Sequence, residues 1–120
     1  METCNNISMC NNMVSMEGYP VDLKVSSSGP AGTDQSDRMG VYLYDDSQLY
    51  NNRPVYQLDR GEEYLYYNDG GYWAIGPTVG GVLFGIATLQ QGLLTPPSTG
   101  WRYADENDQW KNDPQLTVSG

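Results

Sequence analysis

The segment EEYLYYNDGGYWAIG, residues 62–76, constrains the fold more than any other part of this chain. Its centre, NDGG, holds residue types that tolerate a positive φ, so it favours a tight hairpin turn. On both sides of that turn the side chains alternate between the two faces of a strand. The alternation predicts that one face joins the core, while the other keeps Tyr64, Tyr66 and Tyr72. The predicted core face consists of Leu65, Tyr67, Trp73 and Ile75.

Similar short segments, separated by turn signals at regular spacing, continue along the chain. No window of ten residues shows a convincing helical period, and SSGPAGTDQSD (27–37) is typical of a loop. The sequence therefore predicts an all-β fold, a small antiparallel sandwich or barrel of about eight short strands, over residues 20–120. Further strands are predicted at VDLKVSS (21–27), MGVYLYDD (39–46), PVYQL (54–58), GGVLFGIATL (80–89) and PQLTVSG (114–120).

Residues 1–19 differ from the rest of the chain. They are rich in Asn and Met and lack periodicity, which predicts a disordered or loosely held tail or linker. Cys4 and Cys10 lie here and could close a small disulfide loop or pair with a neighbouring domain. Asn6 begins an N-glycosylation triplet with Ile7 and Ser8. Together these signs favour a secreted, extracellular protein.

The charge balance narrows the range of partners. The formal net charge is −9, which argues against a nucleic-acid surface and against an anionic membrane. No run of 18 apolar residues is present, so membrane insertion is not expected. Cationic partners such as calcium or basic proteins, or neutral partners such as glycans, fit this charge better.

The residues needed for common catalytic sites are missing or badly placed. The chain has no His, so it lacks an imidazole base and the usual nucleophilic triads. Both cysteines fall in the predicted tail, a poor place for a nucleophile that needs an ordered pocket. Glu62 and Glu63 are adjacent, and adjacent side chains on a strand point to opposite faces. We therefore expect a non-catalytic protein.

An acidic turn near the C-terminus offers a candidate calcium site. Calcium prefers six to eight oxygen ligands, which alternate residues of one loop often supply. The EF-hand pattern is absent, and a solvated acidic turn is the alternative interpretation. The candidate ligands are Asp105, Asn107, Asp108 and Asp113.

Tyrosines on the predicted strands offer a candidate binding surface. Tyr and Trp combine flat apolar area with a polar edge, which suits sugar rings and protein partners alike. The alternative is that these rings pack inside, with their hydroxyl groups bonded to the backbone; Trp73 and Trp101 are expected in the core. The candidate ligand-binding residues are Tyr42, Tyr44, Tyr64, Tyr66 and Tyr72.

A series of short motifs resembles a β-rich module found in multidomain extracellular proteins of invertebrates. The motifs are Arg53-Pro54-Val55-Tyr56, Tyr64-Leu65-Tyr66-Tyr67, Trp73-Ala74-Ile75-Gly76, Pro96-Pro97 with Gly100-Trp101, and Leu116-Thr117-Val118. The resemblance spans residues 20–118 and implies a secreted, non-catalytic unit of a larger chain.

Two functions follow as hypotheses. The first is an extracellular interaction or adhesion module that binds a glycan or protein partner, with calcium assisting. The second is a structural or cohesive spacer of a matrix or adhesive protein that uses surface tyrosines. Exposure of the rings separates them, since a glycan site needs several exposed rings beside polar groups.

Overall fold

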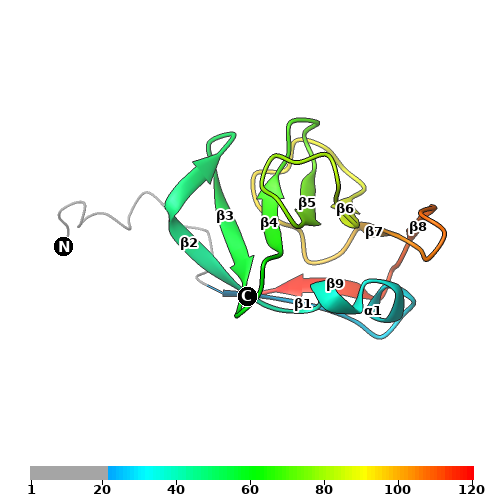
Figure 1. The fold of residues 1–120 in the computed structure, drawn as a ribbon. Helices are drawn as coiled ribbons and strands as arrows, with labels where there is room; N and C mark the ends of the chain where they lie inside the picture. The colour runs from blue at the N-terminus through cyan, green and yellow to red at the C-terminus, as the bar shows by residue number, and fades with distance from the viewer. Residues whose placement is uncertain (1–21) are drawn as a thin grey trace.

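In the computed structural model, which describes residues 22–120, the chain forms one antiparallel sheet of nine strands (Figure 1). The predicted tail, with Cys4, Cys10 and Asn6, lies outside the described residues. One helical turn, α1 (Ala31–Asp34), and a 3-10 turn, η2 (Ser36–Arg38), follow the first strand. The strands are β1 (Asp22–Ser27), β2 (Gly40–Tyr50), β3 (Arg53–Leu58), β4 (Tyr64–Tyr67), β5 (Trp73–Gly76), β6 (Ile86–Thr88), β7 (Trp101–Ala104), β8 (Trp110–Asn112) and β9 (Leu116–Ser119).

The sheet curls into a half-barrel. Strands β2 to β8 are neighbours in chain order, while β1 pairs with β2 and β9 pairs with β1. Figure 1 shows β1 and β9 lying across the open side of β4 to β7. The N–H of Val118 in β9 donates to the carbonyl of Ser98, just before β7, at 3.0 Å. The predicted all-β class is confirmed, and its form is a single curled sheet.

The inner face of this curl holds the main core. The predicted core face of the β4–β5 hairpin is confirmed, because all four of its residues lie in this cluster. Tyr67 pairs with Trp73 across the hairpin, and their rings meet edge to face at 5.5 Å. The buried indole N–H groups of Trp73 and Trp101 donate to the carbonyls of Leu93 and Pro97. Satisfying these donors lets two large rings enter the interior.

The outer face is partly covered as well. The segment between β5 and β6, residues 77–85, folds back over the sheet and closes a second cluster around Tyr66, Ala74 and Ala87. The cover lies very close: a Cβ on Gly76 would stand 2.5 Å from the carbonyl oxygen of Leu83. Glycine is therefore the residue that permits this approach.

This covering segment contradicts the strand predicted over residues 80–89. Only Ile86–Thr88 forms a strand, and Val82 and Leu83 are 89% and 74% exposed. Gly80 adopts a φ of +78°, which turns the chain out of an extended path. The apolar run is thus divided between a loop and a short buried strand.

Candidate functional site

Two of the five candidate tyrosines are buried, so their predicted exposure is wrong. Tyr42 is 0% exposed on the inner face, and its hydroxyl donates to the carbonyl of Arg38 at 2.7 Å. Burial raises the pKa of Tyr42, so this hydroxyl stays protonated. Tyr66 is also 0% exposed, because residues 77–85 cover it, and its hydroxyl lies 3.3 Å from the carbonyl of Gly81.

The other three candidates keep some exposure but do not form a row. Tyr44 borders the inner core, with its ring 6.0 Å from that of Tyr56, whereas Tyr64 borders the outer cluster. These two rings therefore belong to opposite faces of the sheet. Tyr72 lies at the start of the β5 segment and contacts a different set of residues, described next. The predicted tyrosine platform is not assembled as one surface.

Four residues instead form what we call the aromatic–arginine surface: Tyr72, Phe84, Arg102 and Trp110. The guanidinium carbon of Arg102 lies 5.1 Å from the ring centre of Tyr72 and 5.0 Å from that of Trp110. The Phe84 and Trp110 rings lie 5.8 Å apart and are tilted by 48°. Trp110 is 41% exposed, and the other three side chains are half-buried. Rings from separate loops and strands thus meet at one arginine.

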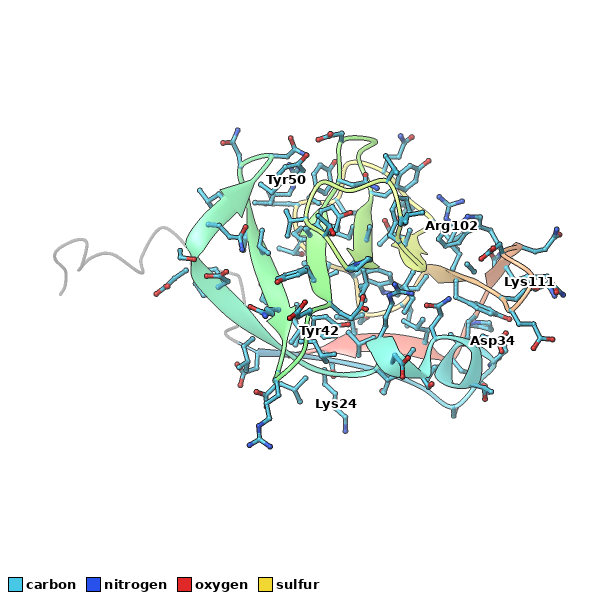
Figure 2. The ribbon with its side chains drawn as sticks, viewed as in Figure 1. Lys24, Asp34, Tyr42, Tyr50, Arg102 and Lys111 are labelled. Atoms are coloured by element: carbon cyan, nitrogen blue, oxygen red, sulfur yellow. The ribbon has the colours of Figure 1, made fainter. Side chains whose placement is uncertain are left out.

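The β7–β8 hairpin positions the arginine and the tryptophan. Arg102 pairs with Asn112 and Ala104 pairs with Trp110, so Arg102 and Trp110 stand on the same face as diagonal neighbours, with the Tyr103–Lys111 pair between them. Figure 2 shows Arg102 and Lys111 at this end of the molecule, away from Tyr50. Because Lys111 alternates with Trp110, its side chain leaves the sheet on the opposite face.

The turn of this hairpin is held by Asp105. Its Oδ1 accepts the N–H groups of Asn107 and Gln109 at 2.8 and 2.9 Å, and its Oδ2 lies 2.9 Å from Nζ of Lys111. The contact with Lys111 and those N–H bonds lower the pKa of the Asp105 carboxyl. Asp108 adopts a φ of +60° and completes the turn. The acidic run therefore shapes the loop that presents Trp110.

The predicted calcium ligands are not brought together. Asp113 is fully buried and accepts bonds from the Ser27 hydroxyl, the Ala31 N–H and the Gln115 N–H. Asp105 is occupied by its own turn, as described above. Within residues 22–120 no group of three acidic side chains is arranged to hold a metal ion. Calcium binding stays a prediction, without a formed site in this turn to support it.

Arg102 differs from Arg38 and Lys111, which form ion pairs within residues 22–120. Arg38 pairs with Glu63 at 2.7 Å, and Lys111 pairs with Asp105. Across residues 22–120, Arg102 makes no ion pair, and its buried Nε donates no hydrogen bond. Its guanidinium carbon lies about 5 Å from the ring centres of Tyr72 and Trp110. A guanidinium carries its N–H donors in its own plane, where a planar acceptor can meet them.

Sequence reasoning missed Phe84, Arg102 and Trp110 as site residues. The signal was the hairpin itself, because RYADENDQW places an arginine and a tryptophan on either side of a turn. Knowing which residues of the two strands pair would have placed Arg102 and Trp110 on one face. This register depends on how many residues the turn leaves unpaired, which the sequence does not show. Phe84 carries no local signal, since a loop brings it there.

A second feature lies beside Tyr44, where the surface is hollowed by an open pocket of about 350 Å³. Its wall mixes apolar side chains with charges of both signs. The lining residues are Leu43, Tyr44, Asp45, Gln57, Leu58, Asp59 and Arg60. It has no ring contact comparable with those around Arg102.

Comparison with known proteins returned no relative: no family profile, curated protein or solved structure matches this chain. The resemblance to an invertebrate extracellular module therefore stays a prediction. Among the described residues, none of the helices has the length and apolar character needed to cross a bilayer.

Proposed function

We propose that this chain is a non-catalytic extracellular recognition module and that the aromatic–arginine surface binds a glycan. The observation that carries the proposal is that two partly exposed rings, Tyr72 and Trp110, both lie against Arg102. Ring faces stack on the apolar faces of sugars, while a planar cation supplies hydrogen bonds to their oxygens. The extracellular assignment rests on the glycosylation triplet at Asn6 and the two tail cysteines.

The size of the surface favours a sugar over a protein. A stable protein interface buries about 800 Å² on each partner. Here Trp110 is 41% exposed and the three neighbouring side chains are half-buried, an area suited to one or two sugar rings. Exposed acids also follow closely in the turn, at Glu106 and Asp108. They would oppose an acidic protein surface more than a compact sugar.

Indole N–H signals in a ¹H–¹⁵N NMR spectrum test this proposal. The chain has three Trp residues, and the indole groups of Trp73 and Trp101 are bonded inside the fold. Adding a panel of neutral and acidic oligosaccharides should shift the Trp110 signal and leave the other two in place. Tyr72→Ala keeps the Trp110 reporter and removes the other ring that lies against Arg102, so it should weaken the response. If no oligosaccharide moves the Trp110 signal, the glycan proposal fails.

Variants at Leu83 separate a glycan from a larger partner. Leu83 immediately precedes Phe84 and is 74% exposed. A sugar stacked on the aromatic–arginine surface should bind Leu83→Ser as it binds the natural chain. A protein interface that spread across this loop would lose affinity in the same variant, because it would use the exposed apolar side chain.

The structural spacer hypothesis keeps one observation in its favour. Several tyrosine hydroxyls are bonded within the fold: Tyr42 to Arg38, Tyr66 to Gly81, and Tyr50 to Asp69 at 2.9 Å. Rings that are dispersed and bonded in this way favour a structural role of the tyrosines, whereas cohesion would need rings that are exposed at the surface. This role would leave the Trp110 indole signal unmoved by every oligosaccharide.

A further inference from the structure

The geometry around Arg102 points to the chemical class of the ligand. The ring centres of Tyr72 and Trp110 lie 5.1 and 5.0 Å from the guanidinium carbon of Arg102, and the terminal N–H groups of this side chain form no ion pair within residues 22–120. These groups present donors in a fixed planar fork, which matches the two oxygens of a carboxylate. No carboxylate within residues 22–120 takes this place.

A second arginine of the chain shows that stacking alone does not leave a free fork. The guanidinium of Arg53 stacks on Tyr67 at 3.7 Å, but its Nη1 also donates to the carbonyl of Asn51. Arg102 has the stacking without such a bond in the described residues. The Nε of both arginines is buried without a partner in residues 22–120, so Arg102 differs from Arg53 at its terminal nitrogens, which are the donors left for a ligand.

The excess of acidic residues in the chain makes the lack of an ion pair at Arg102 within residues 22–120 unexpected. The chain carries 15 acidic and 6 basic residues, so a carboxylate partner within the chain would be easy to supply. The nearest acidic residue along the strand, Asp105, is instead turned to Lys111 and to its own turn. Arg102 is thus one of the cations of residues 22–120 that form no ion pair there, and it lies against two aromatic rings.

We propose that Arg102, flanked by Tyr72 and Trp110, binds the carboxylate of an acidic sugar, such as a sialic or uronic acid. This inference rests on the proposed glycan function and adds the class of sugar. Tyr72 and Trp110 orient the guanidinium and offer ring faces to the sugar, while the N–H groups of the fork donate to both carboxylate oxygens. A single acidic residue suits this site, because a long polyanion would be repelled by the net charge of −9.

Matched ligand pairs test the carboxylate directly on the full 120-residue chain. The first pair is 3′-sialyllactose and lactose; the second is trigalacturonic acid and its methyl ester. The acidic member of each pair is titrated against its neutral partner, with the Trp110 indole signal as the readout. At least one acidic member should bind about tenfold more tightly than its neutral partner, since a charge-assisted bidentate contact is lost.

Arginine variants locate the effect. Arg102→Gln should remove the preference for the acidic sugar, while Arg102→Lys should keep the charge but lose the fork and recover the preference only in part. Arg60→Gln is the matched control, because Arg60 is exposed and lies in the turn between β3 and β4, in the wall of the other pocket. It should bind as the natural chain does.

The outcomes separate this inference from the proposed function. If neutral and acidic sugars shift the Trp110 signal equally, the glycan function stands and the carboxylate inference fails. If no sugar shifts it, both fail. If Arg60→Gln loses binding and Arg102→Gln keeps it, the site is the pocket beside Tyr44. If sodium acetate or an acetylated aspartate peptide binds as tightly as the acidic sugars, the carboxylate comes from a protein and the sugar assignment is overturned.

Discussion

At the scale of single residues, Asp113 is the side chain on which most of the local structure depends. Its Oδ2 accepts the Ser27 hydroxyl at 2.6 Å and the Ala31 N–H at 3.0 Å, and its Oδ1 accepts the Gln115 N–H at 2.9 Å. One buried carboxylate therefore joins the end of β1, the start of α1 and the turn before β9. The sequence analysis placed Asp113 among the candidate calcium ligands. A single acidic residue in a sequence does not show whether it binds a metal ion or accepts hydrogen bonds within the fold.

Replacing Asp113 should destabilise the fold, and the effect should depend on pH. In Asp113→Asn the amide NH₂ replaces one accepting oxygen and faces a group that itself donates. We therefore expect the free energy of unfolding to fall by about 2–3 kcal/mol at pH 7. Burial raises the pKa of Asp113, but bonds from Ser27 and from backbone N–H groups outweigh it and hold the pKa below 3.8. The stabilisation is thus present above that value and is lost as the pH falls through the lower, folded-state pKa.

Urea unfolding at pH 7 and at pH 3 and below measures this difference. The gap between the natural chain and Asp113→Asn should narrow as the pH falls. Asp108→Asn is the control, since Asp108 is exposed in the turn and Asn tolerates its positive φ of 60°. A gap that widened in acid would contradict the proposed role of the ionised carboxylate.

At the scale of elements, periodicity predicted the β4–β5 hairpin and its inner face but not the short strands β7 and β8, nor what covers the outer face. The two-residue alternation at Leu65 and Trp73 is a local property, so the sequence shows it. The burial of Tyr66 depends on residues 77–85 folding back, which is a tertiary contact with no local pattern. The same limit hid the aromatic–arginine surface, which needs Phe84 from that loop and Arg102 from a hairpin of unknown register.

The covering loop predicts a large effect from a small change at Gly76. An added methyl group would meet the Leu83 carbonyl at 2.5 Å and the Phe84 Cα at 2.9 Å, and both are backbone atoms that cannot rotate away. Gly76→Ala should therefore cost about 1–3 kcal/mol and loosen the loop over Tyr66. Chemical denaturation measures the cost, and hydrogen exchange of residues 77–85 measures the loosening.

Gly70→Ala provides the comparison for that experiment. Its added methyl group would have its closest contact at 3.4 Å, with the Asn68 side chain. The Gly70 variant should stay close to the natural stability. Equal losses in both variants would mean that the close approach at Gly76 is not the cause.

At the scale of the whole molecule, acidic charge dominates the surface. The net charge is −9, so the acidic side chains repel one another in the compact state. Screening of this repulsion by salt should raise the melting temperature. Calcium ions would raise the melting temperature by the same screening even without a specific binding site. A specific site adds stabilisation by mass action beyond screening, because it binds the folded state alone.

The two effects separate when the melting temperature is measured in calcium chloride and in sodium chloride of equal ionic strength. Asp105 and Asp113 are occupied by internal bonds, and no acidic group of three gathers within residues 22–120. We therefore expect calcium to raise the melting temperature by at most about 1–2 °C more than sodium does. In a domain of this size a shift of ~4–8 °C corresponds to about 1 kcal/mol, so such a rise would mean well under 1 kcal/mol of specific stabilisation. A rise of several degrees that EDTA reverses would instead show that calcium binds the folded chain specifically. Asp108→Asn would then test the acidic turn, because Asp108 is the exposed carboxylate among the candidate calcium ligands.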